Sequence, residues 1–288
     1  MTNSQSSIAE EYFVALSETP SLSWQGLGFF LLGTVILIFA SSAALSGQIP
    51  LWSASLLNGF ALYLFFAIMH ESLHDTASTN HLTNDILGRF SLMFLIPAAP
   101  IEIARWIHLK HHACTSSPDD PDNFMHHGKW WVLPLRWANF DLFYLVHFFR
   151  YAGSAASKSV TLAVVVQLGS YILLIGACAV NGFGLEVLML YIIPSRIGLA
   201  LVGFVFVFLP HYPADISARE NKYQATTIRQ GWEWLLTPLM VYQNYHLIHH
   251  LYPNIPFYNI IKVWDLQRDE LMAKRPAMQT AFGLRPSS

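Results

Sequence analysis

Four apolar segments, each long enough to cross a lipid bilayer, constrain the fold of this chain more than any other feature. A helix rises about 1.5 Å per residue, so about 20 apolar residues span the hydrocarbon core. Backbone N–H and C=O groups find no water there, and a helix pairs them within one segment. We therefore predict an all-α membrane protein with about four transmembrane helices, at residues 26–46, 50–69, 160–180 and 185–209.

The composition supports a membrane protein. Of the 288 residues, 53% are hydrophobic and only 12% are charged, whereas a soluble domain usually carries about 25% charged residues. The formal net charge of −2 gives no reason to expect a nucleic-acid partner. The two cysteines, Cys114 and Cys178, form no CxxC pair, so neither a disulfide framework nor a thiolate metal site is predicted.

The other segments have their own patterns. Residues 1–25 are polar and acidic, unlike a signal or transit peptide. Residues 86–100 are apolar but short and contain Arg89, which favours a re-entrant or interfacial position. Residues 133–149 mix aromatic and charged side chains and are predicted to lie along the membrane surface. We expect three parts: a polar N-terminal segment (1–25), a membrane domain (26–265) and a C-terminal tail (266–288).

Basic residues are distributed unevenly around the four apolar segments. The connections 47–50 and 181–184 contain no Lys or Arg, and all of the 16 basic residues except Arg196 fall on the other side. Because positive charge is retained in the cytoplasm, both termini and a helical cap on that side are predicted to be cytoplasmic, with a bacterial inner membrane favoured. Arg196 lies inside the fourth segment, where it could contact a lipid headgroup, pair with Glu186 or reach the interface.

Three histidine clusters lie on that same side. The first has the spacing HxxxH and the other two have HxxHH, and helical positions i, i+3 and i+4 share one face. Eight converging imidazoles exceed the three or four ligands of one zinc ion, so they indicate two metals, and imidazole suits iron, zinc or copper. His211 follows the fourth segment and would be a ninth ligand. The clusters are His70 and His74; His108, His111 and His112; and His246, His249 and His250.

Polar residues near the clusters could orient these histidines. A ligating histidine needs an acceptor for its other ring N–H, and Asn244 could hold a metal-bound water. The aspartates after the second cluster could equally form a solvated turn. Four histidines without cluster spacing are expected to be surface or interfacial: His81, His126, His127 and His147. The candidate acceptors are Glu71, Asp75, Asp119, Asp120 and Asp122.

Two other interpretations fit parts of this pattern. The residues HESLH at 70–74 also match HExxH, the signature of a zinc protease with Glu71 as the base, but that site leaves both HxxHH clusters unexplained. A non-catalytic metal carrier or sensor should have a polar path across the bilayer. The first three apolar segments contain no ionisable residue in their cores, which argues against such a path.

The sequences around the clusters resemble a known family. HESLHD, HLKHHACTSSPDDPD and NYHLIHHLYPNIPFY are similar to the three histidine boxes of the integral-membrane fatty acid desaturase superfamily, over roughly residues 45–260. That superfamily also contains membrane hydroxylases and carotenoid hydroxylases and ketolases. The resemblance implies that residues 26–265 form a di-iron desaturase-like domain, that two iron ions (Fe2+/Fe3+) use O2 against an unactivated C–H bond, and that His211 is a ligand.

We expect a fatty acid (acyl-lipid) desaturase, which introduces a double bond into an acyl chain; the HxxxH spacing of the first box occurs in both branches and does not decide the substrate. The alternative is a carotenoid hydroxylase or ketolase, or another membrane lipid or alkane hydroxylase. No cysteine quartet for an iron–sulfur cluster exists, so an external electron donor, a ferredoxin or a cytochrome with its reductase, is expected. Large side chains next to the clusters favour a narrow slot by volume alone: Leu62, Phe65, Phe66, Met69, Phe204, Val205, Phe206 and Phe208.

Overall fold

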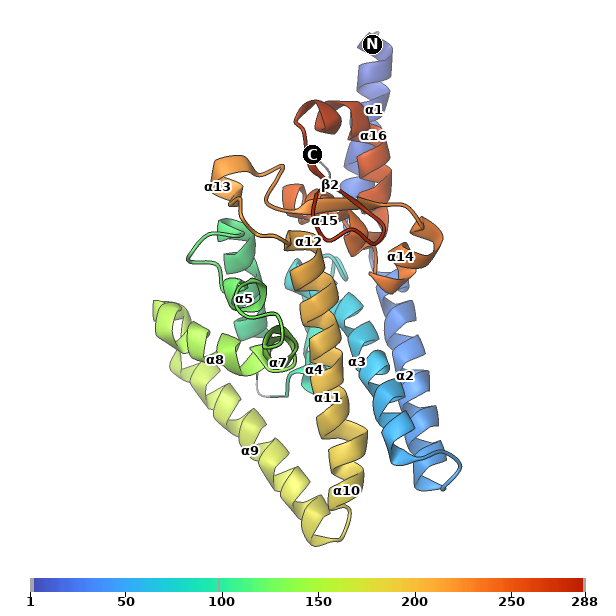
Figure 1. Ribbon diagram of the computed structural model, residues 1–288, viewed down its shortest axis with the longest axis vertical. Coiled ribbons are helices and arrows are strands. Elements are labelled where there is room, and N and C mark those ends of the chain that lie inside the picture. Colours follow the sequence, from blue (N-terminus) through green and yellow to red (C-terminus); the bar gives the residue numbers. More distant parts are fainter. Residues whose placement is uncertain (1–2, 98, 287–288) are drawn as a thin grey trace.

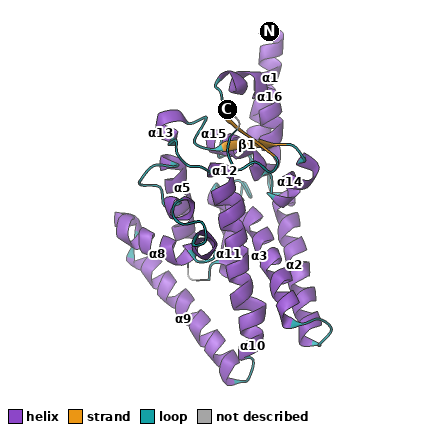
Figure 2. Cartoon of the chain, in the orientation of Figure 1, coloured by secondary structure: helices purple, strands orange, loops and turns teal. Residues whose placement is uncertain are grey.

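The computed structural model describes residues 3–97 and 99–286. Among these residues, four helices are long and apolar enough to cross a membrane, which confirms the predicted all-α membrane fold. They stand side by side, with both chain termini at one end and two short connections at the other (Figures 1 and 2). They are α2 (Trp24–Leu45), α3 (Leu51–Leu73), α9 (Lys158–Val180) and a composite helix, Gly184–His211.

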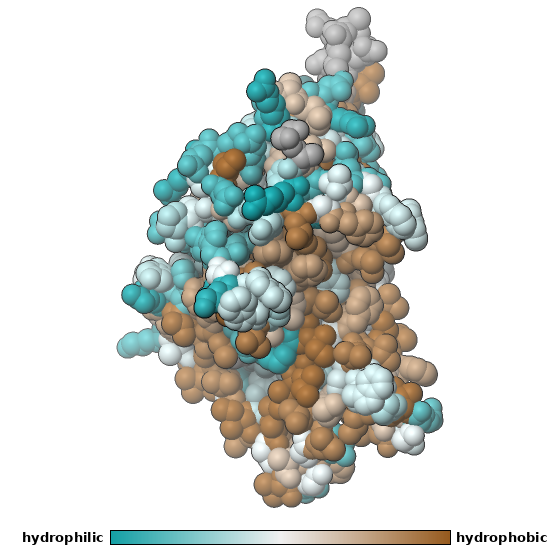
Figure 3. Space-filling model, viewed as in Figure 1, coloured by the Kyte–Doolittle hydropathy of each residue, from teal (hydrophilic) through white to brown (hydrophobic). Residues whose placement is uncertain are grey.

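Helix α3 is the central helix. It packs against α2 and against the composite helix, and its side chains are buried without a break from Ala61 to Leu73. Of the residues of α9, in contrast, only Val164 is buried. Figure 3 shows hydrophobic residues over the part of the surface that these long helices form, and hydrophilic residues gathered toward the end with the termini. This division is the one expected where lipid replaces water around the helices.

The composite helix is interrupted where proline removes a backbone donor. Pro194 has no N–H, so one helical bond to a preceding carbonyl is lost, and the residues just before it form a π-helical turn. Side chains of α3 donate to two carbonyls of this turn: Asn58 Nδ2 to Leu190 at 3.1 Å, and Ser55 Oγ to Met189. The helix consists of α10 (Gly184–Val187), η2 (Leu188–Ile192), α11 (Ile193–Val202), η3 (Gly203–Phe208) and α12 (Leu209–His211).

Shorter helices connect α3 to α9. Residues 86–100 were expected not to span the membrane, and they are not among the spanning helices. Up to Leu95 they belong to α4, and the described residues between 96 and 100 are not helical. The single surface helix predicted at 133–149 is instead divided in two around Ala138 and Asn139. The helices are α4 (His81–Leu95), α5 (Ile101–Cys114), α6 (Asn123–His126), α7 (Leu133–Trp137), α8 (Phe140–Tyr151) and the 3-10 turn η1 (Gly153–Ala155).

Arg196 does not pair with Glu186 in this structure. Its guanidinium instead donates to both carboxylate oxygens of Asp141 on α8, at 2.9 and 2.8 Å, and to the carbonyl of Ala138 at 3.2 Å. The Asp141 side chain is 4% exposed. A fork of two parallel hydrogen bonds to a buried carboxylate satisfies a charge that the membrane would otherwise penalise. The pair therefore ties the surface helix to the fourth spanning helix.

The segment after the composite helix forms a cap over the end with the termini (Figure 1). Its two short parallel strands, which the all-α prediction did not include, pair Thr227 with Ala277 and Gln230 with Thr280. The elements are α13 (Ala218–Asn221), β1 (Thr227–Gln230), α14 (Glu233–Leu239), η4 (Gln243–Tyr245), α15 (His246–Leu251), η5 (Phe257–Asn259), α16 (Ile260–Ala273) and β2 (Ala277–Thr280).

Both ends of the chain are part of this cap. The boundary expected at residue 265 falls inside α16, and the presumed tail supplies β2. Helix α1 (Asn3–Ser17) packs against α16 and the residues before it: Asn259 Nδ2, in η5, donates to the carbonyl of Leu16 at 3.0 Å, and the ring of Phe13 lies 5.2 Å from that of Tyr252, which follows α15. Leu16 belongs to the buried cluster that also contains Leu247 and Ile248 of α15, the helix that carries the third histidine cluster.

We predict that removing one partner of the Asp141–Arg196 pair destabilises the protein more than removing both. In Asp141→Leu the guanidinium loses its carboxylate in an apolar setting, at a cost of about 3–5 kcal/mol. In the double variant Asp141→Leu/Arg196→Met no charge is left to solvate. Thermal unfolding in nanodiscs should therefore give a lower midpoint for the single variant. A double variant that melts no higher than the single one would contradict this account.

Candidate metal centre

The three histidine clusters meet at one place, although they lie on different helices. His70 is in the last turn of α3 and His74 caps its end. The second cluster lies on α5 and the third on α15, which ends at Leu251, two residues before Pro253. His211 is the last residue of α12. The helical spacing places each set of rings on one face, and the fold brings those faces together.

Eight of the nine imidazoles form two groups of four. Within each group, one ring nitrogen from every histidine lies within 4.8 Å of the others, so each group could hold a metal ion. The ninth, His112, lies between the groups: its Nε2 is 3.2 Å from that of His108 and 3.1 Å from that of His249, and its ring stacks on His250 at 4.2 Å. The first group is His70, His74, His108 and His249, and the second is His111, His211, His246 and His250.

The contacts between these rings fit cations better than hydrogen bonds. Nε2 of His246 lies 3.0 Å from Nε2 of both His211 and His250. A ring nitrogen carries either one proton or one lone pair, so hydrogen bonding within such a trio leaves one close nitrogen pair unsatisfied. Nε2 of His70 is buried and has no hydrogen-bond partner among the described residues. A metal ion bound by the ring nitrogens would satisfy every lone pair at once.

Burial keeps most of these imidazoles neutral. It lowers the pKa of His74 to about 3, and the charge that His111 can carry adds to the effect. Burial, with the charges of neighbouring histidines, also lowers the pKa well below its usual value in five more rings. Neutral imidazole is the form that binds metal, so these six rings can bind cations at neutral pH. The five are His108, His112, His246, His249 and His250.

His111 differs because two carboxylates face it. Its Nδ1 lies 3.0 Å from Asp120 Oδ1 and 3.3 Å from Asp122 Oδ2. Burial alone would lower the pKa of His111, but the two negative charges and the hydrogen bond that its Nδ1–H donates to Asp120 outweigh it and raise the pKa to about 9. Burial has the opposite effect on a carboxyl group, and it raises the pKa of Asp122 to about 6. A carboxylate on Nδ1 orients a ligating histidine and increases its basicity.

The other predicted acceptors are placed differently. Asp119 is exposed, and Asp75 faces Arg105 at 3.5 Å and Asn84 at 3.0 Å, so neither is turned toward a histidine. Glu71 is 2% exposed and accepts from the backbone N–H of Phe257 at 3.2 Å. Its second oxygen has no hydrogen-bond partner in the described part of the chain.

Asn244 presents an unused acceptor. Its Nδ2 donates to Thr237 Oγ1 at 3.1 Å. Its Oδ1 is buried and, within residues 3–97 and 99–286, accepts from no described group. A buried amide oxygen of this kind is normally satisfied by water, which is consistent with the water-holding role predicted for it.

Sequence reasoning missed two residues that contact the histidine rings. Gln243 Oε1 accepts from Nδ1 of His246, and Thr115 Oγ1 lies 3.2 Å from Nδ1 of His250. Gln243 precedes His246 by three residues, about one helical turn, and this spacing could have indicated it. No local signal pointed to Thr115, because it belongs to a segment far from His250 in the sequence.

One of the four histidines expected at the surface is buried. His126 is 5% exposed, and its ring centroid lies 5.5 Å from that of His211. The expectation was wrong for this residue because α6 folds back against η3. His81 and His127 are exposed and His147 is half-buried, as expected for surface or interfacial positions.

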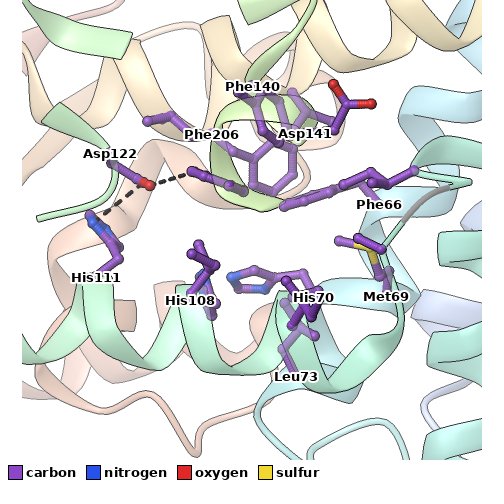
Figure 4. Close-up of a pocket in the computed structure, with 18 of the residues that line it drawn as sticks. Phe66, Met69, His70, Leu73, His108, His111, Asp122, Phe140, Asp141 and Phe206 are labelled. Carbon is purple, nitrogen blue, oxygen red and sulfur yellow. Dashed lines mark hydrogen bonds and ion pairs between the residues drawn. The ribbon is translucent and has the colours of Figure 1, made fainter. Parts of the chain in front are cut away.

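A narrow apolar cavity of about 60 Å³ adjoins the histidines. In Figure 4, His70, His108 and His111 line one side of it, and Phe66, Phe140 and Phe206 lie opposite. The rings of Phe66 and Phe206 pack against each other in the wall of this cavity, with their centroids 4.3 Å apart. Of the large side chains predicted to border the site, Phe66, Met69 and Phe206 line this cavity, whereas Phe204 packs against Trp137.

Comparison with known proteins gives two matches. A sequence model of the fatty acid desaturase family matches residues 46–282. The chain is also 26% identical, over 231 residues, to the dihydrorhizobitoxine desaturase of Bradyrhizobium elkanii. That alignment covers 70% of this chain and 63% of the relative, so the chain spans less than two thirds of that protein's length. Because the family match covers most of the chain and includes all three histidine clusters, this chain belongs to the fatty acid desaturase family.

Proposed function

We propose that this protein is an O2-dependent di-iron desaturase that introduces a double bond into an acyl chain of a membrane lipid. The observation that carries the proposal is the position of the narrow apolar cavity directly against His70 and His108. Membership of the desaturase family supports an oxidoreductase of this type. The name of the bacterial relative, a desaturase, favours formation of a double bond over hydroxylation.

Nine histidines would hold two irons in this proposal. One group of four would bind each iron, and His112 would contribute from its position between them. When bound, the irons would supply the redox chemistry that activates O2 against an unactivated C–H bond. Asp120 and Asp122 would hold the orientation of His111, Gln243 that of His246, and Asn244 would hold a water at the centre.

The cavity residues would position the substrate and exclude water. Phe66, Met69 and Phe206 offer only apolar surface, so a polymethylene chain loses no hydrogen bond on entering. The small volume leaves no wide pocket, and a polymethylene chain is thinner than the cyclohexenyl ring of a carotenoid. The cavity therefore favours the acyl chain.

The proposed site faces the cytoplasm. The two short connections 47–50 and 181–184 contain no basic residue, and all basic residues except Arg196, which lies inside the fourth spanning helix, fall on the opposite side of the bundle. The positive-inside rule favours the cytoplasm for that side. Electrons would arrive there from a separate donor, a ferredoxin or a cytochrome with its reductase. A bacterial inner membrane is the favoured location.

Lipid analysis tests the proposed reaction. We expect new double bonds in membrane acyl chains when the protein is produced, with a suitable electron donor, in a host that contains both fatty acids and carotenoids. His246→Ala is the matched control and should leave the acyl profile unchanged, because it removes the ring nitrogen closest to both His211 and His250. Unchanged acyl chains together with hydroxyl or keto groups on carotenoids would overturn the acyl-chain assignment.

Cysteine labelling tests the proposed orientation. In a background with Cys114 and Cys178 replaced by serine, cysteine at Gly182 should react with an impermeant reagent applied to intact cells. Cysteine at the exposed position Lys222, in the cap, should react only after lysis. The reverse pattern would place the histidine groups outside the cytoplasm.

A further inference from the structure

His211 is the exception within the second histidine group. Each of the other three rings has a partner for its second nitrogen, as metal-binding histidines normally do. Nδ1 of His211 is buried and has no hydrogen-bond partner among the residues that the structure describes. The three partnered nitrogens are Nδ1 of His111 with Asp120 (3.0 Å), of His250 with Thr115 (3.2 Å) and of His246 with Gln243.

His126 adjoins the ring of His211 and is itself unsatisfied. The ring centroids are 5.5 Å apart and the ring planes meet at 60°. His126 is 5% exposed, and neither of its ring nitrogens finds a hydrogen-bond partner in residues 3–97 and 99–286. Burying such groups unpaired is unfavourable, and a buried water commonly bridges them. Two neighbouring buried rings with three unpaired nitrogens are such a case.

The fold, and not the metal groups, fixes the position of His126. It ends α6, whose backbone is held by two side chains of α7. Trp137 Nε1 donates to the carbonyl of Met125 at 3.0 Å, and Arg136 donates to those of Phe124, at 3.0 Å, and His127. The ring of Phe208 also stacks on His126 at 6.4 Å. These contacts hold the backbone on both sides of His126, and none of them involves a histidine of the two groups.

We propose that His126 is a positioning residue of the metal centre, which accepts the hydrogen bond of His211 Nδ1–H through one buried water. With its proton held on Nδ1, His211 keeps the lone pair on Nε2, the atom that lies 3.0 Å from Nε2 of His246. His126 supplies to His211 the hydrogen-bond acceptor that Asp120, Thr115 and Gln243 supply to the other rings of the group. The inference rests on the proposed function only in requiring that the histidine groups bind metal.

Chelator competition against Co2+, with the full chain in nanodiscs, tests this role without measuring turnover. His126→Phe keeps a ring against Phe208 but removes both nitrogens. The affinity for one of the two bound cobalt ions should then fall roughly 10- to 100-fold, the usual effect of losing the partner of a ligating histidine. His126→Gln retains an acceptor and should recover part of the loss. The exposed neighbour gives the control, and His127→Phe should match the unmodified protein.

The outcomes separate this inference from the proposed reaction. Equal cobalt affinity in His126→Phe and the unmodified protein would overturn it. Equal losses in His126→Phe and His126→Gln would also overturn it, because they would point to packing and not to an acceptor. Absence of lipid desaturation, with the cobalt result as expected, would count against the proposed function alone.

Discussion

The structure depends on one constraint: nine imidazoles are gathered in the protein interior with their ring nitrogens facing one another. Nε2 atoms approach to 2.8 Å between His74 and His108 and to 3.0 Å between His211 and His246. Burial removes the water that would otherwise satisfy them, and it lowers the pKa of His74 to about 3, which prevents protonation from doing so. Bound cations satisfy such an arrangement, and the surrounding fold has to hold it together.

That support comes from polar contacts at places where helices are broken or end. The broken fourth helix is held to α3 by Asn58, which donates to Leu190 at 3.1 Å, and to α8 by Arg196 with Asp141. The same helix ends at His211 after a π-helical stretch, a feature that often accompanies functional sites. The cap, closed by β1, β2 and α1, packs against α15. The apolar helices therefore form most of the structure, and a few polar contacts fix the relative positions of the helices that carry the histidines.

The spanning helices and the three histidine clusters were predictable because hydropathy and helical periodicity are local properties of a sequence. The predicted helix ends differ from the observed ones by a few residues, and the two HxxHH clusters each lie on one helix, as their spacing indicated. Long-range contacts were not predictable. Asp141 is 55 residues from Arg196, and Thr115 is 135 residues from His250. The acidic run after the second cluster shows the same limit, because only the turn geometry decides that Asp120 faces His111 while Asp119 is exposed.

Metal content tests the central claim most directly. Protein purified under iron-replete conditions should approach two iron ions per chain by elemental analysis, and X-ray absorption at the iron edge should show nitrogen ligands without sulfur. Both results follow from the two groups of four histidines, which among the described residues include no cysteine. One tightly held zinc ion per chain, with no iron, would contradict the account and would favour the single-metal HExxH interpretation of His70, Glu71 and His74.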